Sequence, residues 1–144
     1  MATTINPTTL TYSVTEQITL NGIVFDTTTE NTVTGIGNYV NNIFNVDTGT
    51  QGIILFSRTG VAPRDTEYDI DNVKYLRISN ADDTNNITVT LDWQASADSV
   101  VVVAPGGSFI LTEFINAGAA DTLGTIRITC TANADVPYVI GLTS

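Results

Sequence analysis

The residues with the clearest potential for chemistry form an Asp-Thr-Gly triplet, Asp47–Gly49, directly after an apolar segment that ends at Val46. Two aspartates that share one proton can act as general acid and general base in the hydrolysis of a peptide bond. A chain of this length holds one such triplet, so a second copy of the chain would have to supply the second aspartate.

This triplet resembles the active-site motif of aspartic proteases, but Asn45 interrupts the apolar run that those enzymes show before it. Asp, Thr and Gly are also common in this chain, and each of them is common in turns. We therefore interpret Asp47–Gly49 as a turn between two strands and predict that the protein is not an enzyme.

Carboxylates that could bind a divalent cation alternate along the segment between Pro63 and Asn72, and two more follow the next strand. Calcium loops normally contain a glycine at the sharp bend, and none lies in this segment. We therefore predict a solvated loop and no metal or other cofactor, and leave cation binding as the alternative. The carboxylates are Asp65, Glu67, Asp69, Asp71, Asp82 and Asp83.

Several catalytic arrangements are excluded by composition. The chain has no histidine, which excludes a Ser-His-Asp or Cys-His site and any zinc site that needs histidine. The single cysteine, Cys130, cannot form a disulfide within the chain. Because it lies on the apolar side of the alternating run Ile126–Cys130, we expect a buried, unreactive thiol.

The net charge of −10 and the pI near 4.1 limit the classes of partner. So few basic residues cannot neutralise a phosphate backbone, and anionic membranes are disfavoured for the same reason. We therefore predict no binding to nucleic acid or membrane. No Lys or Arg precedes Arg58, so the positive start of a secretory signal is missing and we expect synthesis without such export.

Short strand-like runs separated by turn residues dominate the second half of the chain. Polar breaks and the turn Pro105–Gly107 separate four of these runs, which predicts a β-meander. Further runs before and after bring the total to about nine or ten short strands, so we predict an all-β fold, an antiparallel β-sandwich of the jelly-roll type by preference. The four runs are Val73–Ser79, Ile87–Trp93, Ser99–Ala104 and Phe109–Leu111.

The first third of the chain is harder to interpret. Residues 1–10 show no periodicity, so we expect an extended N-terminal arm followed by one sandwich domain over residues 11–144. Ile18–Phe25 is a predicted strand with Asn21-Gly22 as a turn or bulge inside it, and Thr27–Asn31 is a predicted polar turn.

Ile36–Val46 fits two structures. Its apolar residues match the spacing of one helix face, but its glycines and asparagines are poor helix formers. We predict an extended segment with Phe44 and Val46 on one face, and helix remains the alternative.

One resemblance bears on function. The runs KYLRISNADDTNNITVTL and SVVVVAPGGSFIL resemble small β-sandwich virion proteins of tailed bacteriophages, in which a strand ending in Asn leads through an Asp-Thr-Asn turn into a second strand. The resemblance covers the region from about Tyr39 to Leu111. It implies a capsid decoration (cement) protein, commonly a homotrimer, that is made in the host cytoplasm and binds the major capsid protein on the capsid exterior.

That resemblance implies no catalytic residues. As a separate hypothesis, we expect an ordered N-terminal arm to make part of the contact with the capsid or with other subunits. The interface residues expected there are Met1, Ile5, Pro7, Leu10 and Tyr12.

The alternative function is a tail-fibre or baseplate module that binds host glycan through exposed aromatic rings, for which Tyr68, Tyr75 and Trp93 are candidates. Trp93 continues the apolar phase of Ile87–Trp93, which favours a place in the core or an interface instead.

Overall fold

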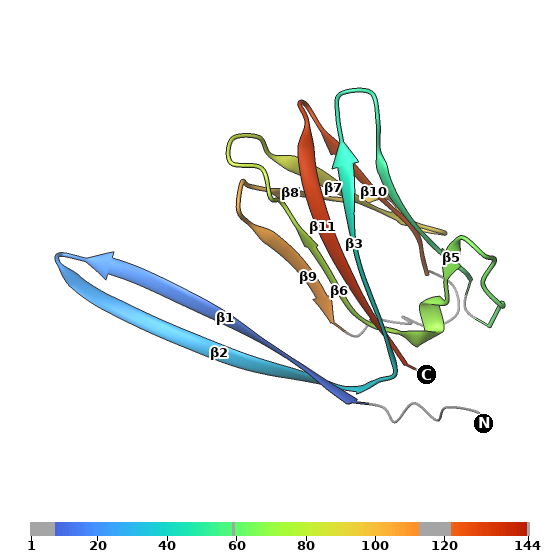
Figure 1. Ribbon diagram of the computed structural model, residues 1–144, viewed down its shortest axis with the longest axis horizontal. Coiled ribbons are helices and arrows are strands. Elements are labelled where there is room, and N and C mark those ends of the chain that lie inside the picture. The colour runs from blue at the N-terminus through green and yellow to red at the C-terminus, as the bar shows by residue number, and fades with distance from the viewer. Residues whose placement is uncertain (1–7, 59, 113–121, 144) are drawn as a thin grey trace.

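The computed structural model describes residues 8–58, 60–112 and 122–143, and these residues form an all-β protein. A long two-stranded ribbon projects from a sandwich of two packed sheets (Figure 1). The predicted all-β sandwich is therefore confirmed.

The sandwich has one five-stranded and one four-stranded sheet. The larger sheet has the order β5-β4-β10-β7-β8, and the smaller has the order β3-β11-β6-β9. The bounds are β3 (Asn38–Val46), β4 (Gly52–Phe56), β5 (Glu67–Tyr68), β6 (Val73–Ser79), β7 (Ile87–Trp93), β8 (Ser99–Val103), β9 (Ser108–Thr112), β10 (Leu123–Cys130) and β11 (Ala134–Leu142).

Nested antiparallel pairs define the topology. The innermost pair is β7–β8, and the pairs β6–β9, β4–β10 and β3–β11 enclose it in turn. Two further pairings, β10–β7 and β11–β6, join the nested pairs into sheets. Eight strands paired in this way, with the chain crossing between two sheets, form a jelly roll. The short strand β5 adds to the edge of the larger sheet, parallel to β4.

The predicted meander is wrong, although its strands lie where the sequence places them. Strands β7 and β8 are neighbours, but β6 and β9 pair with each other in the opposite sheet. The polar break after Ser79 and the turn Pro105–Gly107 both carry the chain from one sheet to the other. Alternating hydrophobicity is the same whether a strand pairs with the next strand in the sequence or lies in the opposite sheet. It therefore does not show which sheet a strand joins.

The core lies between the two sheets, where each strand directs every second side chain inward. Strand β7 shows the pattern, because Ile87, Val89 and Leu91 are buried while the threonines between them are half-buried. The opposite sheet contributes Leu76 and Ile78 from β6, both fully buried. This single core requires both sheets to be in place.

The ribbon consists of β1 (Thr8–Leu20) and β2 (Ile23–Ile36), which pair antiparallel along their length. Asn21 and Gly22, with φ of 51° and 80°, form the two-residue turn between them. Positive φ at both central residues is typical of the tight turns that join twisted strands, and Asn-Gly suits it best. The turn predicted at Asn21-Gly22 is confirmed.

Two other expectations for this part of the chain need revision. Thr27–Asn31 lies within β2 and is not a turn, because its β-branched threonines fit the extended backbone of a strand. Strand β1 runs without a break through the expected boundary at residue 10. The segment that leaves the sandwich is therefore the whole ribbon, which is longer than the expected arm.

The extended structure predicted for Ile36–Val46 is confirmed by β3, in which Phe44 packs against the core and Val46 is fully buried. The next segment turns as predicted, through Asp47–Gly49 into β4. Pro63 and the residues after it lead to the short β5 and to one 3-10 turn, Ile70–Asn72.

Candidate functional site

Asp47 acts as the acceptor that closes its own turn. Its side-chain carboxylate accepts the backbone N–H of Gly49 at 2.8 Å, and its backbone N–H donates to the Thr50 hydroxyl at 2.9 Å. The backbone N–H of Gly49 is the main cause that lowers the pKa of Asp47, and the Thr50 side chain lowers it further. A proton-sharing pair needs one aspartate with a raised pKa, so this geometry is that of a turn.

The acidic segment before β6 uses its carboxylates in the same way. Asp69 accepts the backbone N–H of Asp71 at 3.1 Å and the side-chain amide of Asn72 at 2.9 Å. Asp71 in turn accepts the backbone N–H of Gly60 at 2.6 Å. Among the residues that the structure describes, no three acidic or cysteine side chains gather in a group that could hold a metal ion.

Asp82 organises the connection between β6 and β7. Its carboxylate accepts the backbone N–H groups of Asn85 and Thr84, the latter at 2.7 Å. These bonds, with that of Asn85 the larger cause, lower the pKa of Asp82 below its usual value.

A lowered pKa in the folded state makes stability depend on pH. The ionised Asp82 stabilises the fold above the ordinary carboxyl pKa of about 4, and this contribution is lost as the pH falls through the lower folded value. We expect Asp82→Ala to lower the midpoint of urea unfolding at pH 7. The difference between this midpoint and that of the unmodified protein should become smaller below about pH 4. Asp83→Ala, which removes one exposed bond to the Thr84 hydroxyl, is the matched control. A difference in midpoint that stays constant with pH would contradict this role of Asp82.

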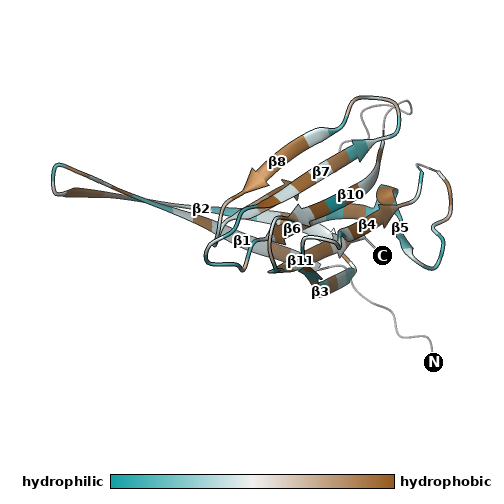
Figure 2. Cartoon of the chain, turned by 90° about the horizontal axis from the view of Figure 1, so that it is seen from above, coloured by the Kyte–Doolittle hydropathy of each residue, from teal (hydrophilic) through white to brown (hydrophobic). Residues whose placement is uncertain are grey.

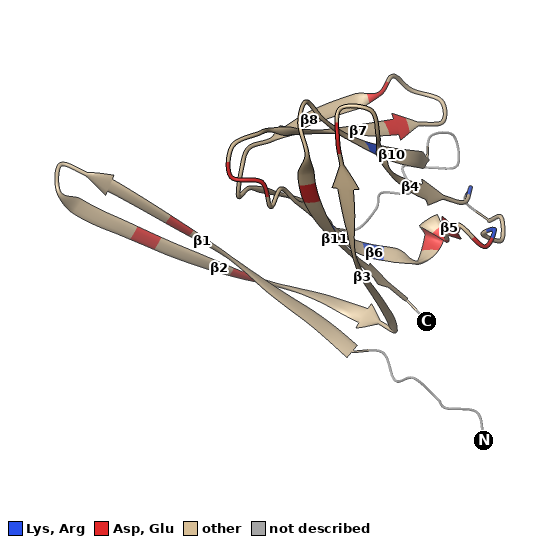
Figure 3. Cartoon of the chain, turned by 45° about the horizontal axis from the view of Figure 1, so that its top comes forward, with Lys and Arg blue, Asp and Glu red and all other residues tan. Residues whose placement is uncertain are grey.

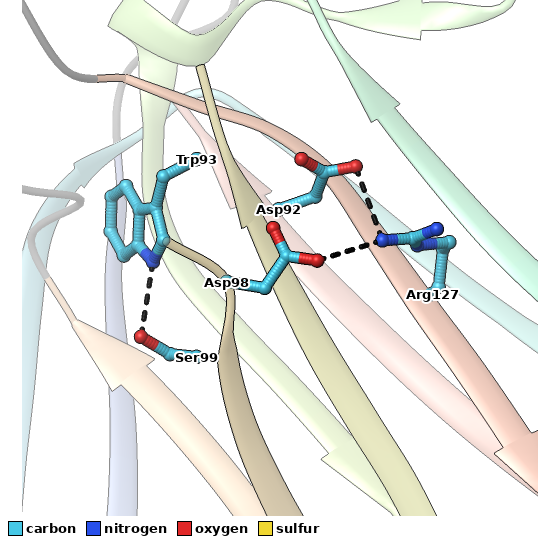
Figure 4. A network of polar contacts seen from close by, with 5 residues as sticks. All are labelled: Asp92, Trp93, Asp98, Ser99 and Arg127. Carbon is cyan, nitrogen blue, oxygen red and sulfur yellow. Dashed lines mark hydrogen bonds and ion pairs between the residues drawn. The ribbon is translucent and has the colours of Figure 1, made fainter. Parts of the chain in front are cut away.

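A network of polar contacts lies beside Trp93 at the β7–β8 hairpin (Figure 4). Arg127 of β10 contacts Asp92 at 3.4 Å and Asp98 at 3.0 Å, between the two carboxylates. Trp93 packs partly buried against the core, as its apolar phase predicts, and its indole N–H donates to the Ser99 hydroxyl at 3.3 Å. Cys130 is half-buried, less than expected, with its thiol 3.3 Å from the Asn86 carbonyl oxygen.

The three aromatic residues considered for glycan binding do not form a patch. Tyr75 is 2% exposed and lies against Tyr12 of the ribbon, with ring centroids 5.4 Å apart. Tyr68 packs on Phe56, and burial is the main cause that raises its pKa to about 12. With Trp93 packed on the core as well, no shared flat surface is left for a sugar ring.

The ribbon presents the clearest functional feature, because its two faces differ in chemistry. Residues directly opposite each other in an antiparallel pair lie on the same face. One face carries Leu10 opposite Val33, Ile18 opposite Phe25 and Leu20 opposite Ile23, together with Tyr12 and Val14. The polar pair Glu16–Thr27, and Asn31 and Thr29 opposite Tyr12 and Val14, interrupt this face in the middle of the ribbon. The other face carries Thr11 opposite Thr32, Ser13 opposite Glu30, Thr15 opposite Thr28 and Gln17 opposite Asp26, and its one apolar residue is Val24 opposite Thr19. The ribbon is therefore amphipathic at its base and near its turn, with a polar break at Glu16 and Thr27 between them.

Only the base of the apolar face is covered. Leu10, Tyr12 and Val33 are half-buried there, near Tyr75 of the smaller sheet. Toward the turn, Ile18 is 56% exposed and Phe25 54%. The far end of the ribbon stands clear of the sandwich and carries hydrophobic colour in Figure 2.

The charge of the ribbon is purely negative. Glu16, Asp26 and Glu30 are its only charged side chains, and every Lys and Arg of the chain lies at Arg58 or beyond (Figure 3). Asp26 accepts a hydrogen bond from Gln17 at 2.9 Å on the polar face.

Of the predicted interface residues, Met1, Ile5 and Pro7 lie outside the described residues. Leu10 and Tyr12 lie at the base of the ribbon, on its apolar face. The sequence prediction missed the distal residues Ile18, Leu20, Ile23 and Phe25. Alternation of apolar and polar residues from Leu10 to Leu20, broken only at Glu16, was the signal that could have identified them.

Comparisons with protein families, with characterised proteins and with solved structures found no match to this chain. Within the described residues, no helix is long and apolar enough to cross a membrane. The candidate site is thus defined by its geometry: a ribbon with an exposed apolar end, held out from a jelly roll.

Proposed function

We propose that the protein is a capsid decoration (cement) protein of a tailed bacteriophage, which binds the outer surface of the capsid and staples neighbouring subunits of the major capsid protein. It is made in the host cytoplasm and acts on the virion, without enzymatic chemistry. The resemblance of the β3–β9 region to such proteins suggests the phage setting, and the projecting ribbon is the observation that carries the mechanism.

The ribbon supports a role in binding because a two-stranded hairpin is marginally stable in water by itself. Its 13-residue and 14-residue strands leave large aliphatic and aromatic side chains exposed on one face. A specific protein interface takes about 20–30 residues from each side, so one face of the ribbon can provide a substantial part of one. In this proposal its apolar face lies across neighbouring shell subunits.

The acidic charge favours the capsid exterior over the side that faces DNA, since a chain with net charge −10 is repelled by phosphates. A protein that binds only the assembled shell stabilises it by mass action, because dissociation must come before the shell opens.

Purified particles of the phage that encodes the chain provide the test. We expect an antibody against the sandwich to label capsids and not tails. Particles stripped of the protein should bind the purified full chain again, so that it sediments with them. Labelling of tails only, or a chain that stays in the supernatant, would refute the proposal.

A further inference from the structure

Strand β8 leaves one edge of the larger sheet without a pairing strand in the described part of the chain. Natural proteins protect such edges with lysine, proline, a bulge or a very short strand. Ser99–Val103 has no charged residue and no proline, and its pairing with β7 is regular over five positions. Val100 and Val102 are each 61% exposed on this strand. The edge therefore has the features of a strand that pairs with another chain.

The other edge strands of the sandwich differ from β8 in length, polarity or exposure. Strand β5 has two residues, of which Glu67 contacts Arg64 at 4.0 Å. Strand β3 is rich in asparagine, and Asn45 binds Asp135 of its neighbour at 2.8 Å. Strand β9 is also uncharged, but its three large side chains are half-buried.

We infer that β8 pairs antiparallel with β8 of a second copy of this chain, so that the two five-stranded sheets join across a two-fold axis. A two-fold interface uses the same patch on both copies and must be complementary to itself. Pairing centred on Val101 places Val100 of each copy opposite Val102 of the other. Such β-branched cross-strand pairs stabilise an antiparallel ladder.

Charge opposes self-association least at this edge. Two chains of net charge −10 repel each other, and the approach is least unfavourable where no charge is exposed. Ser99–Gly107 contains no charged residue, and Asp98, which precedes it, is held by Arg127 at 3.0 Å. Figure 2 shows β8 as a hydrophobic strand at the margin of the sandwich.

This self-association is independent of the proposed capsid binding, and it differs from the homotrimer that the resemblance implies. An interface of two five-residue strands is small, and small interfaces dissociate on dilution. We therefore expect a concentration-dependent dimer, with a mass that rises from 15.3 kDa toward twice that value.

Sedimentation equilibrium of the full chain over a concentration series tests the inference. The double variant Val100→Lys with Val102→Lys places lysines opposite lysines across the two-fold axis, so we expect association at least ten times weaker. The matched control, Ile43→Lys with Ile53→Lys, adds the same charge at two other exposed aliphatic positions and should still form the dimer. Circular dichroism shows whether each variant is folded.

Four outcomes would overturn the inference. They are a monomer at every concentration, a trimer, an unchanged dimer in the β8 variant, and loss of the dimer when Ile18 and Phe25 of the ribbon are replaced by aspartate. The last result would make the ribbon the interface between copies.

Discussion

Replacing Ile18 and Phe25 with aspartate is expected to abolish binding to the capsid while the sandwich stays folded. The two side chains lie opposite each other on the apolar face, 56% and 54% exposed, so the change costs little in the free protein. In the complex with the capsid, the double variant would bury two carboxylates against apolar surface, which is strongly unfavourable. Central interface residues contribute about 2 kcal/mol or more each, so we expect affinity to fall by more than about 100-fold. Co-sedimentation with stripped particles measures the loss.

The polar face of the same ribbon provides the control. Thr15 and Thr28 are also opposite each other, with their hydroxyl oxygens 3.1 Å apart and exposed. Thr15→Asp with Thr28→Asp adds the same charge at the same part of the ribbon, and should retain most of the binding. Equal losses in both variants would show that charge, and not the apolar face, determines the effect.

Asn80→Ala is expected to lower the free energy of unfolding by about 2–4 kcal/mol, since it leaves buried backbone groups without partners. Asn80 is 1% exposed. Its side-chain amide donates to the carbonyl oxygens of Asn85 at 2.8 Å and Val103 at 3.0 Å, and its side-chain oxygen accepts the backbone N–H of Asp82 at 3.1 Å. These bonds hold the β6–β7 connection against the end of β8.

Urea unfolding followed by tryptophan fluorescence measures this change, and a drop in the melting temperature of roughly 5–15 °C should accompany it. Asn133→Ala, at an exposed turn before β11, is the matched control and should stay close to the unmodified protein. Similar stability of the two variants would contradict the role given to Asn80.

The positions of most strands could be predicted from the sequence, because alternation and turn residues act locally. Asn21-Gly22 and Pro105–Gly107 turn the chain where their chemistry requires it. The choice of neighbour could not be predicted, since it depends on contacts between distant segments. Strand β11 inserts between β3 and β6, and nothing local in Ala134–Leu142 specifies that position.

The sequence of the ribbon predicts a strand over β1 but favours a turn over part of β2. In Thr27–Asn31 the side chains that point to either face of the ribbon are polar. The alternation of apolar and polar residues seen in β1 is therefore absent from this part of β2. A polar run between apolar runs is typical of a turn. The pairing of Thr27 with Glu16 shows instead that it continues the strand. The exposure of the distal apolar residues is a tertiary property and required the structure.

The nesting of strand pairs constrains the order in which this protein can fold during synthesis. The ribbon pairs only neighbours in sequence, so it can form as soon as Ile36 has left the ribosome. The outermost pair of the sandwich joins Asn38 to Leu142. Contacts of such long sequence separation form slowly. Strand β3 must therefore wait, unpaired, until Leu142 has been made, and β11 then joins the smaller sheet between β3 and β6.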